Sequence, residues 1–272
     1  MPSITTDDGV RLSYAEHGDP TGRPVVLIAG FKAPATSWKS QQQAFGAAGY
    51  RVLSLDRRGH GLSDRPAFGA TMARHGADVG AFLAELDLRD VVLVGGSMGG
   101  NTIWAYLTSA SSDGGADRLR GIVIVDQTPK MLNSADWPYG FYGYDESNRD
   151  TLFAETVPDP GRVSLRSKGV VRIGRLVRAL GGGERRRLTD PEKQLLKDHA
   201  VADWRPVIAD VDVPVLFVAG RESEFWPAEH AAAAAALGWS GSSVVLEKAG
   251  HAANIEQPRR FNEEVLRYLA SL

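Results

Sequence analysis

The fold of this chain is decided by residues 91–99, which read VVLVGGSMG. Four consecutive apolar residues, three of them β-branched, are typical of a strand buried on both faces of a parallel sheet. The pattern G-x-S-x-G in residues 95–99 follows at once, and residues 98–109 are helix-like. Glycine is expected beside Ser97 because so sharp a strand-to-helix turn leaves no room for side chains. The stretch therefore predicts that a tight turn presents the Ser97 hydroxyl at the carboxyl edge of a sheet, next to a helix N-terminus.

Strand-like and helix-like segments alternate on both sides of this stretch, as in a parallel sheet covered by helices. An Asp-Asp-Gly turn at residues 7–9 predicts an N-terminal hairpin of residues 3–6 and 10–16. The other strand-like segments are residues 24–29, 50–55, 121–125, 213–219 and 244–246. The other helix-like segments are residues 36–48, 71–86, 228–237 and 258–269.

The alternation stops between about residues 127 and 208, where no strong strand-like run occurs. Helix-like segments lie near residues 146–157, 163–180 and 191–204. A mostly helical insertion between the strands of a parallel sheet is usually a lid or cap. We therefore expect one core made of residues 1–127 and 208–272, and a helical cap of residues 128–207.

The expected cap contains a basic segment. Residues 162–187 hold nine Lys and Arg residues and one Glu, a net charge of +8, so the rest of the chain carries −10 of the total of −2. Apolar residues recur there at helical spacing, while Arg172, Arg175 and Arg178 fall on another face. This pattern predicts a solvated basic helix face. Attraction of an anionic substrate or of an acidic surface is the alternative.

Composition excludes several classes of protein and site. The 272 residues include no cysteine, which excludes disulfides, thiolate metal sites and a cysteine nucleophile. The near-neutral net charge argues against nucleic-acid binding. No histidines are spaced as a metal pair on one helix face, so we expect no metal and no cofactor. The N-terminus has no signal-like pattern, and no apolar run approaches the ~20 residues of a membrane span, which predicts a cytoplasmic protein without membrane insertion.

A serine hydroxyl is a weak nucleophile that needs a general base, and the base needs an orienting acid. His251 lies between the last strand-like and the last helix-like segments, so it should reach the same sheet edge as Ser97. We therefore expect His251 to be the base. His60, in the DRRGHG run of residues 56–61, fits a structural role in a loop. Surface or packing roles fit the four other histidines, His17, His75, His199 and His230.

In these motifs and their order the sequence resembles the α/β-hydrolase fold family, in the branch of bromoperoxidase-like esterases, lactonases and enol-lactone hydrolases. The matching residues are 29–31, Trp38, 56–63, 95–99 and 250–251, and the resemblance covers the chain apart from the cap. It implies an α/β fold with a mostly parallel eight-stranded sheet, flanking helices and an inserted helical cap.

The resemblance also implies an oxyanion hole made by the backbone N–H groups of Phe31 and Met98. This chain has Ala29 where the family usually has histidine, and the backbone role survives that change. Each such donor is worth roughly 3 to 4 kcal/mol of transition-state stabilisation where one has been removed.

The acid that orients the histidine is left open by the sequence. In the family it usually follows the strand at residues 213–219, where this chain has Ser223. Asp126 is one candidate, because some members of the family take their acid from the end of the preceding strand. Glu222 and Glu224 flank the vacant position and are the alternatives. Asp126 could instead only cap a turn, and the chain could then have no functioning acid.

The activity implied by the resemblance is hydrolysis of a carboxylic ester or lactone of a small molecule, through an acyl-enzyme on Ser97. Cleavage of a C–C bond or an amide, and perhydrolysis, would use the same serine and histidine. A binding protein without turnover and a peripheral membrane protein docked by the basic segment are further alternatives. Nothing in the sequence predicts an oligomeric state. Three aromatic residues are expected in the substrate pocket, or else in the core of the cap: Trp137, Tyr139 and Trp226.

Overall fold

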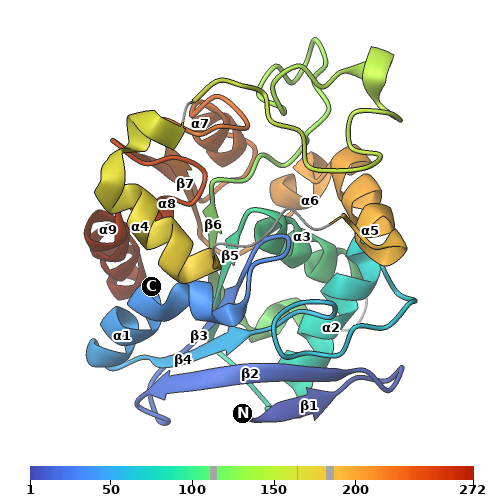
Figure 1. Cartoon of the computed structure of the whole chain (residues 1–272). Helices are drawn as coiled ribbons and strands as arrows, with labels where there is room; N and C mark the ends of the chain where they lie inside the picture. Colours follow the sequence, from blue (N-terminus) through green and yellow to red (C-terminus); the bar gives the residue numbers. More distant parts are fainter. Residues whose placement is uncertain (111–114, 164, 182–186) are drawn as a thin grey trace.

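Runs of valine, leucine and isoleucine build the centre of the molecule as an eight-stranded sheet (Figure 1). The structure is a computed structural model, and it describes residues 1–110, 115–163, 165–181 and 187–272. The strands lie in the order β1-β2-β4-β3-β5-β6-β7-β8. Their bounds are Ser3–Thr5 for β1, Arg11–Gly18 for β2, Pro24–Ile28 for β3, Arg51–Leu55 for β4, Val91–Gly96 for β5, Leu119–Val125 for β6, Val215–Gly220 for β7 and Gly241–Leu246 for β8.

The sheet is antiparallel at one edge and parallel elsewhere. β1 pairs with β2, and β2 with β4, in antiparallel register. The pairs β4–β3, β3–β5, β5–β6, β6–β7 and β7–β8 are all parallel. The predicted N-terminal hairpin and the mostly parallel eight-stranded sheet are therefore confirmed. Parallel strands end on the same side, so the loops after β3, β5, β6, β7 and β8 meet at one edge of the sheet.

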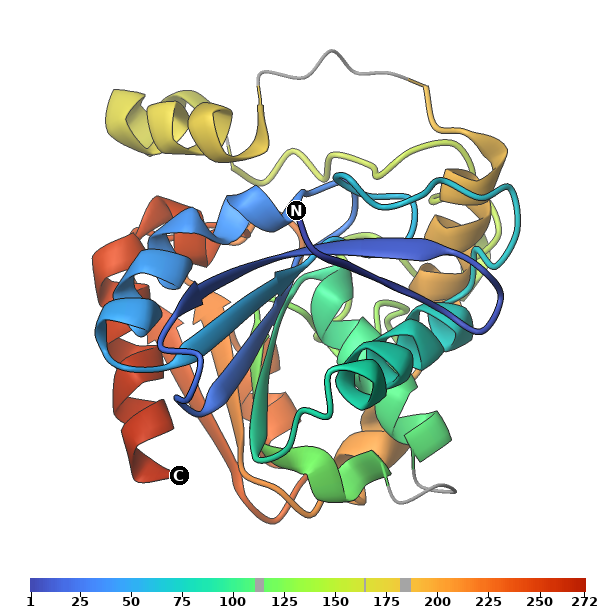
Figure 2. The same cartoon turned by 90° about the horizontal axis from the view of Figure 1, so that it is seen from below.

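Helices cover both faces of the sheet (Figures 1 and 2). On one face, α1 (Lys39–Ala47) and α9 (Pro258–Ser271) bury Phe45 and Phe261 against β3, β4 and β5. On the other face, α2 (Met72–Glu85), α3 (Met98–Ala110) and α7 (His230–Ala235) bury Phe82 and Trp104. Both layers are apolar and tightly filled, which fixes the sheet edge on which the site is built.

The chain between β6 and β7 lies across that edge, with α4 and α5 on opposite sides of it (Figure 1). The helices of this part are α4 (Gly169–Leu180), α5 (Asp190–Val201) and α6 (Arg205–Ala209). Short 3₁₀ turns occur at η3 (Glu146–Asn148) and η4 (Leu165–Lys168), as they do in the core at η1 (Ala35–Trp38) and η2 (Gly115–Arg118). A last short helix, α8 (Ala253–Glu256), follows β8.

The helix predicted for residues 146–157 is wrong, because only the turn η3 forms there. Tyr144 Oη donates a hydrogen bond to the carbonyl of Arg149 (3.0 Å), which in a continuing helix would accept from the N–H of Phe153. Phe153 instead packs its ring edge-on against Phe141 and Tyr144. Aromatic packing in this segment therefore outweighs its helical periodicity.

The turn after β5 has the tight geometry that its sequence predicts. Ser97 has a positive φ of 52°, a strained conformation for a residue with a side chain. A Cβ on Gly95 would lie 2.6 Å from the backbone of Gly100, and a Cβ on Gly99 would overlap the carbonyl oxygen of Ile28 in β3. The glycines of the motif are therefore required by the close approach of α3 to β3 and β5.

We predict that Gly99→Ala lowers the free energy of unfolding by about 2 to 3 kcal/mol, since its new Cβ meets backbone that cannot rotate away. Gly174→Ala is the matched control, because nothing lies within 4 Å of a Cβ at that helical position. That variant should be as stable as the parent or up to about 1 kcal/mol more stable. Urea unfolding followed by circular dichroism measures both, and an unchanged midpoint for Gly99→Ala would contradict the packing described.

Candidate active site

Ser97 opens onto a cavity of about 700 Å³ that lies between the sheet edge and the chain connecting β6 to β7. His251, Phe31 and Met98 line the same cavity. Side chains from the inserted segment form much of the remaining wall, and they are mostly apolar: Met131, Phe141, Phe153, Leu188 and Leu196. The predicted nucleophile and base therefore share one apolar chamber.

Asp126, at the end of β6, is the carboxylate that contacts the imidazole of His251. Its Oδ2 lies 2.9 Å from His251 Nδ1, which leaves Nε2 for the cavity. The Asp126 side chain is fully buried, and its own φ is positive at 45°. It also accepts hydrogen bonds from the N–H of Gly220 (2.8 Å) and from Ser223 Oγ (2.6 Å). The structure thus brings an acid and a base together beside the cavity of Ser97.

The charge of Asp126 is maintained despite its burial. Burial by itself would raise the pKa of this carboxyl, but the imidazoles of His230 and His251 outweigh it and lower the pKa to about 2. His230 is buried, and its Nε2 lies 3.7 Å from Asp126 Oδ1. Asp126 is therefore ionised at neutral pH and can balance a positive charge on His251.

The two alternative acids have other partners. Glu224 Oε2 accepts a hydrogen bond from the backbone N–H of His251 (2.7 Å), and the carboxylate forms an ion pair with Lys168. Glu222 forms an ion pair with Arg172 (2.7 Å). Among the contacts of the described residues, neither carboxylate reaches the imidazole. Asp126 is the candidate acid that the geometry favours.

Ion pairs join Lys168 of η4 and Arg172 of α4 to the loop after β7 and to α8. Lys168 is buried and also lies 2.6 Å from Glu256 of α8. Arg172 contacts both Glu222 and Glu256. The predicted solvated basic face is therefore wrong for Arg172, because acids of the core neutralise it. Arg185 and Arg186 of the basic segment lie outside the described residues.

The resemblance implies that the backbone N–H groups of Phe31 and Met98 form an oxyanion hole. Both residues line the cavity, and Met98 begins α3, where the first N–H groups of a helix have no intrahelical acceptor. A Cβ on Gly30 would lie only 2.9 Å from Ser97 Cβ, so the loop after β3 runs directly beside the serine. In the described part of the chain no hydrogen bond uses either N–H. Both donors are available to an oxygen bound in the cavity.

Only one of the three predicted pocket aromatics lines the cavity. Trp226 does, together with Phe225, and its ring meets the His251 ring edge-on at 5.3 Å between centroids. Trp137 and Tyr139 do not, which corrects their prediction as pocket residues. Trp137 is buried in the core, where its indole N–H donates to Thr128 Oγ1 (3.0 Å) and its ring packs against Tyr139. That hydrogen bond and the edge-on ring contact hold both rings away from the chamber.

The sequence predicts a surface or packing role for His199 and does not predict its place at the cavity. It lies on α5, is buried, and lines the cavity. Burial, followed by the charge of Arg57, lowers the pKa of His199 to about 3, so the ring is neutral. Its Nδ1 lies 3.5 Å from Asn101 Nδ2. The helical spacing of Leu195, His199 and their neighbours was the signal that could have placed it on a buried face.

Other kinds of site find no support in the described residues. No group of three or more His, Asp or Glu residues there could hold a metal ion. In the same part of the chain, no helix combines the length and apolar character needed to cross a membrane.

Comparisons with known proteins identify relatives of the chain. A family model described as "Alpha/beta hydrolase family" matches residues 25–264. Among curated proteins, the chain is 28% identical over 285 residues to a non-heme chloroperoxidase of Streptomyces lividans, with full coverage of both chains. It is 24% identical to a bifunctional esterase/perhydrolase of Acinetobacter calcoaceticus, again over the full length of both. The crystal structure of a bromoperoxidase from Bacillus anthracis superposes with a TM-score of 0.77 at 26% identity, covering 99% of this chain and 100% of that one.

We predict that the contribution of Asp126 to stability depends on pH. Its folded pKa of about 2 lies below the ordinary 3.8, so its charge stabilises the fold above about pH 4, and this contribution is lost as the pH falls towards 2. The gap in unfolding free energy between the parent and Asp126→Asn should shrink by about 1 kcal/mol from pH 6 to pH 3. Urea unfolding across this range measures it. A constant gap for Asp126→Asn would be the contrary result.

Proposed function

The chain belongs to the alpha/beta hydrolase family, and from that premise we propose that it is a serine hydrolase that cleaves a carboxylic ester or lactone of a small molecule. The observation that carries the proposal is the 2.9 Å contact between Asp126 and His251, beside a cavity that His251 shares with Ser97. Each member of this set has one chemical task.

Acylation begins when His251 Nε2 takes the proton from Ser97 Oγ while that oxygen attacks the substrate carbonyl carbon. The carbonyl oxygen becomes negative and binds to the N–H groups of Phe31 and Met98. The imidazolium of His251 is balanced by Asp126. When the tetrahedral intermediate collapses, the C–O bond to the alcohol breaks, and His251 returns its proton to the leaving oxygen.

Deacylation repeats these steps with water in the place of Ser97. His251 takes a proton from water as the water oxygen attacks the acyl carbon. The intermediate again uses the same two N–H groups. The bond to Ser97 Oγ then breaks, the serine regains its proton from His251, and the carboxylic acid leaves. These steps require no cofactor.

The contacts of Asp126 support it as the acid. Ser223 occupies the family's usual acid position, and its hydroxyl donates to the Asp126 carboxylate at 2.6 Å. The serine therefore assists the neighbouring carboxylate rather than leaving His251 unsupported. A binding protein without turnover would be favoured if His251 had no acid beside it. The contacts of Asp126 therefore weaken that alternative.

The cavity suggests an uncharged, largely apolar substrate. Its walls are mostly aromatic and aliphatic, and His199 offers a neutral polar group. Two basic residues, Lys32 and Arg187, are matched there by two acidic ones, Glu155 and Asp159. The described lining therefore gives no net attraction for an anionic substrate. We also propose that residues 128–207 act as a cap over the chamber, because they supply much of this wall.

Perhydrolysis is a second candidate function, favoured by the full-length similarity to a chloroperoxidase and to an esterase/perhydrolase. In this reaction hydrogen peroxide replaces water in the second step. The peroxide oxygen attacks the acyl carbon, His251 takes its proton, and the bond to Ser97 Oγ breaks to release a peracid. The same groups serve both reactions, so the nucleophile that enters the cavity decides the product.

We predict that a fluorophosphonate labels Ser97 rapidly, and that mass spectrometry finds the label on the peptide containing this residue. Asp126→Asn should slow labelling by about four orders of magnitude, since the imidazole loses its orienting charge. Glu222→Gln and Glu224→Gln are matched carboxylate controls and should stay within a few-fold of the parent. Ser97→Ala should not be labelled. A parent protein that remains unlabelled at Ser97 would reject the proposed function.

We further predict that acetate and hydrogen peroxide together yield peracetic acid in the presence of the parent protein and not of Ser97→Ala. Oxidation of bromide by the peracid, followed with a dye, measures the product. Equal product from the two proteins would exclude perhydrolysis on Ser97 and leave ester or lactone hydrolysis as the function.

A further inference from the structure

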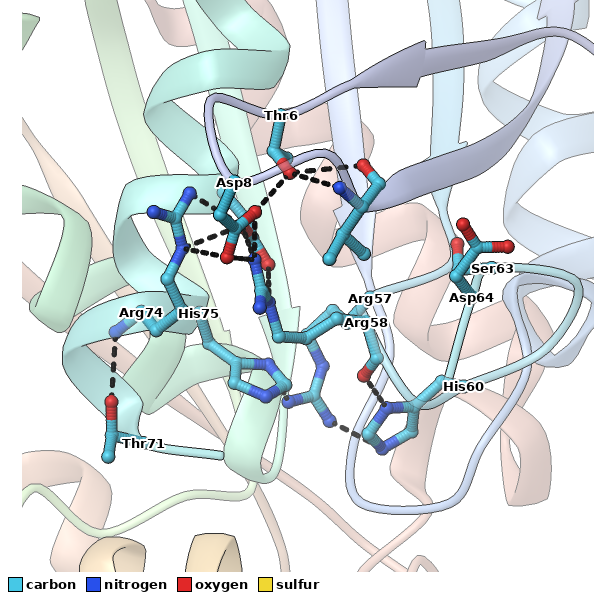
Figure 3. Close-up of polar contacts among 12 residues, drawn as sticks. Thr6, Asp8, Arg57, Arg58, His60, Ser63, Asp64, Thr71, Arg74 and His75 are labelled. Carbon is cyan, nitrogen blue, oxygen red and sulfur yellow. Dashed lines mark hydrogen bonds and ion pairs between the residues drawn. The ribbon is translucent and has the colours of Figure 1, made fainter. Parts of the chain in front are cut away.

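Arg57 is a buried cation that contacts no carboxylate among the residues that the structure describes. It lies in the loop after β4 and is 3% exposed. Its guanidinium donates to the carbonyl of Ala29 (Nε, 3.0 Å) and to that of Gly30 (Nη2, 2.9 Å). It also contacts His75 Nδ1 (3.1 Å) and His60 Nε2 (3.2 Å), as Figure 3 shows. Burying an unpaired charge destabilises a fold, so these four contacts call for an explanation beyond packing.

The next residue shows that this region can provide carboxylates. Arg58 is equally buried and lies 2.5 Å from Asp78. It also lies 3.0 Å from Asp8, a contact that Figure 3 shows. The guanidinium of Arg57 instead contacts two backbone carbonyls, those of Ala29 and Gly30. The difference between these adjacent arginines is therefore one of partners and not of burial.

The two carbonyls belong to the loop that carries the expected oxyanion donor. The carbonyl of Gly30 and the N–H of Phe31 are the two ends of one planar peptide group. No described peptide is cis, so this C=O and this N–H point in opposite directions. Because Arg57 holds the carbonyl end, the N–H end must face away from Arg57. Phe31 lines the cavity of Ser97, and Gly30 lies directly beside that serine. The carbonyl of Gly30 also accepts a hydrogen bond from the N–H of Ala33 (3.2 Å).

We propose that Arg57 is a positioning residue that orients and polarises the Gly30–Phe31 peptide as an oxyanion donor. The inference rests on the proposed function, since it assumes that an oxyanion forms at Ser97. A charge-assisted hydrogen bond to a carbonyl is stronger than a neutral one and polarises the attached N–H. Arg57 thereby fixes the donor's direction and increases its strength, without touching the substrate.

The surrounding histidines are consistent with this role. His60 Nδ1 lies 2.8 Å from the carbonyl of Arg58, which places the ring proton on Nδ1 and leaves Nε2 to accept from Arg57. Burial first, then the charge of Arg57, holds the pKa values of His60 and His75 well below the ordinary value. Both rings are therefore neutral acceptors. The ring of His60 also packs edge-on against Phe31 (6.2 Å between centroids), which supports the same loop.

The test compares Arg57→Gln with Arg58→Gln, its neighbour in the same loop with equal burial. With p-nitrophenyl acetate, Arg57→Gln should lower kcat about 10- to 100-fold with KM nearly unchanged, because the oxyanion exists only in the transition state. Phenylboronic acid, which binds a reactive serine as a tetrahedral anion, should bind more weakly by a similar factor. Arg58→Gln should lower the melting temperature, while kcat and boronate affinity stay within about 3-fold of the parent.

Arg57→Lys keeps the charge but cannot reach both carbonyls, so its kcat should lie between those of the parent and Arg57→Gln. It is also the variant to measure if Arg57→Gln does not fold. A folded Arg57 variant that hydrolyses the ester with parental kcat and boronate affinity would overturn the inference and leave the proposed function intact. A parent protein that neither hydrolyses esters nor is labelled at Ser97 would overturn both.

Discussion

The site depends on keeping the fully buried carboxylate of Asp126 ionised. A buried charge without partners would destabilise the fold by several kcal/mol. Here the N–H of Gly220, the hydroxyl of Ser223 and the imidazole of His251 all donate to it. Gly220 is the last residue of β7, Ser223 follows β7, and His251 follows β8. All three donors therefore reach the carboxylate only when β6, β7 and β8 are in register. The parallel sheet therefore brings together the donors that keep Asp126 ionised. The carboxylate in turn holds the loop of His251 against the sheet.

The proposed acid, Asp126, follows β6 and not β7, the strand that the resemblance implies for it, and the register of the sheet shows why this is possible. Val125 of β6 pairs with Val218 of β7, so the residues that follow both strands arrive at the same edge, next to each other. A carboxylate after either strand can meet the same imidazole. In this chain Asp126 contacts His251, while Ser223 donates a hydrogen bond to Asp126. The carboxylate therefore comes from the end of β6, and the residue after β7 supports it with a hydroxyl.

The sequence was sufficient where local pattern and burial agree. The β-branched runs of the core and the turn at Ser97 are such cases. The apolar runs fit only a buried strand, and the glycines beside Ser97 fit only a tight turn. The choice among Asp126, Glu222 and Glu224 needed the register of β6 and β7, which no spacing reveals. The inserted segment was less predictable, since contacts between distant residues decide it. Tyr144 donates a hydrogen bond to the carbonyl of Arg149, which a helix would use for its own hydrogen bonds. Glu256 forms an ion pair with the basic residue Arg172.

Two fixed charges of opposite sign flank Ser97, and the proposed reaction creates two charges of opposite sign between them. His251 becomes positive next to Asp126, and the carbonyl oxygen becomes negative next to the peptide that Arg57 holds. In a chamber of mostly apolar walls these interactions are little weakened by water. Both fixed charges are oriented by folding before the substrate arrives, so little reorganisation is needed as charge develops. In the proposed reaction this arrangement stabilises the charge separation of the transition state.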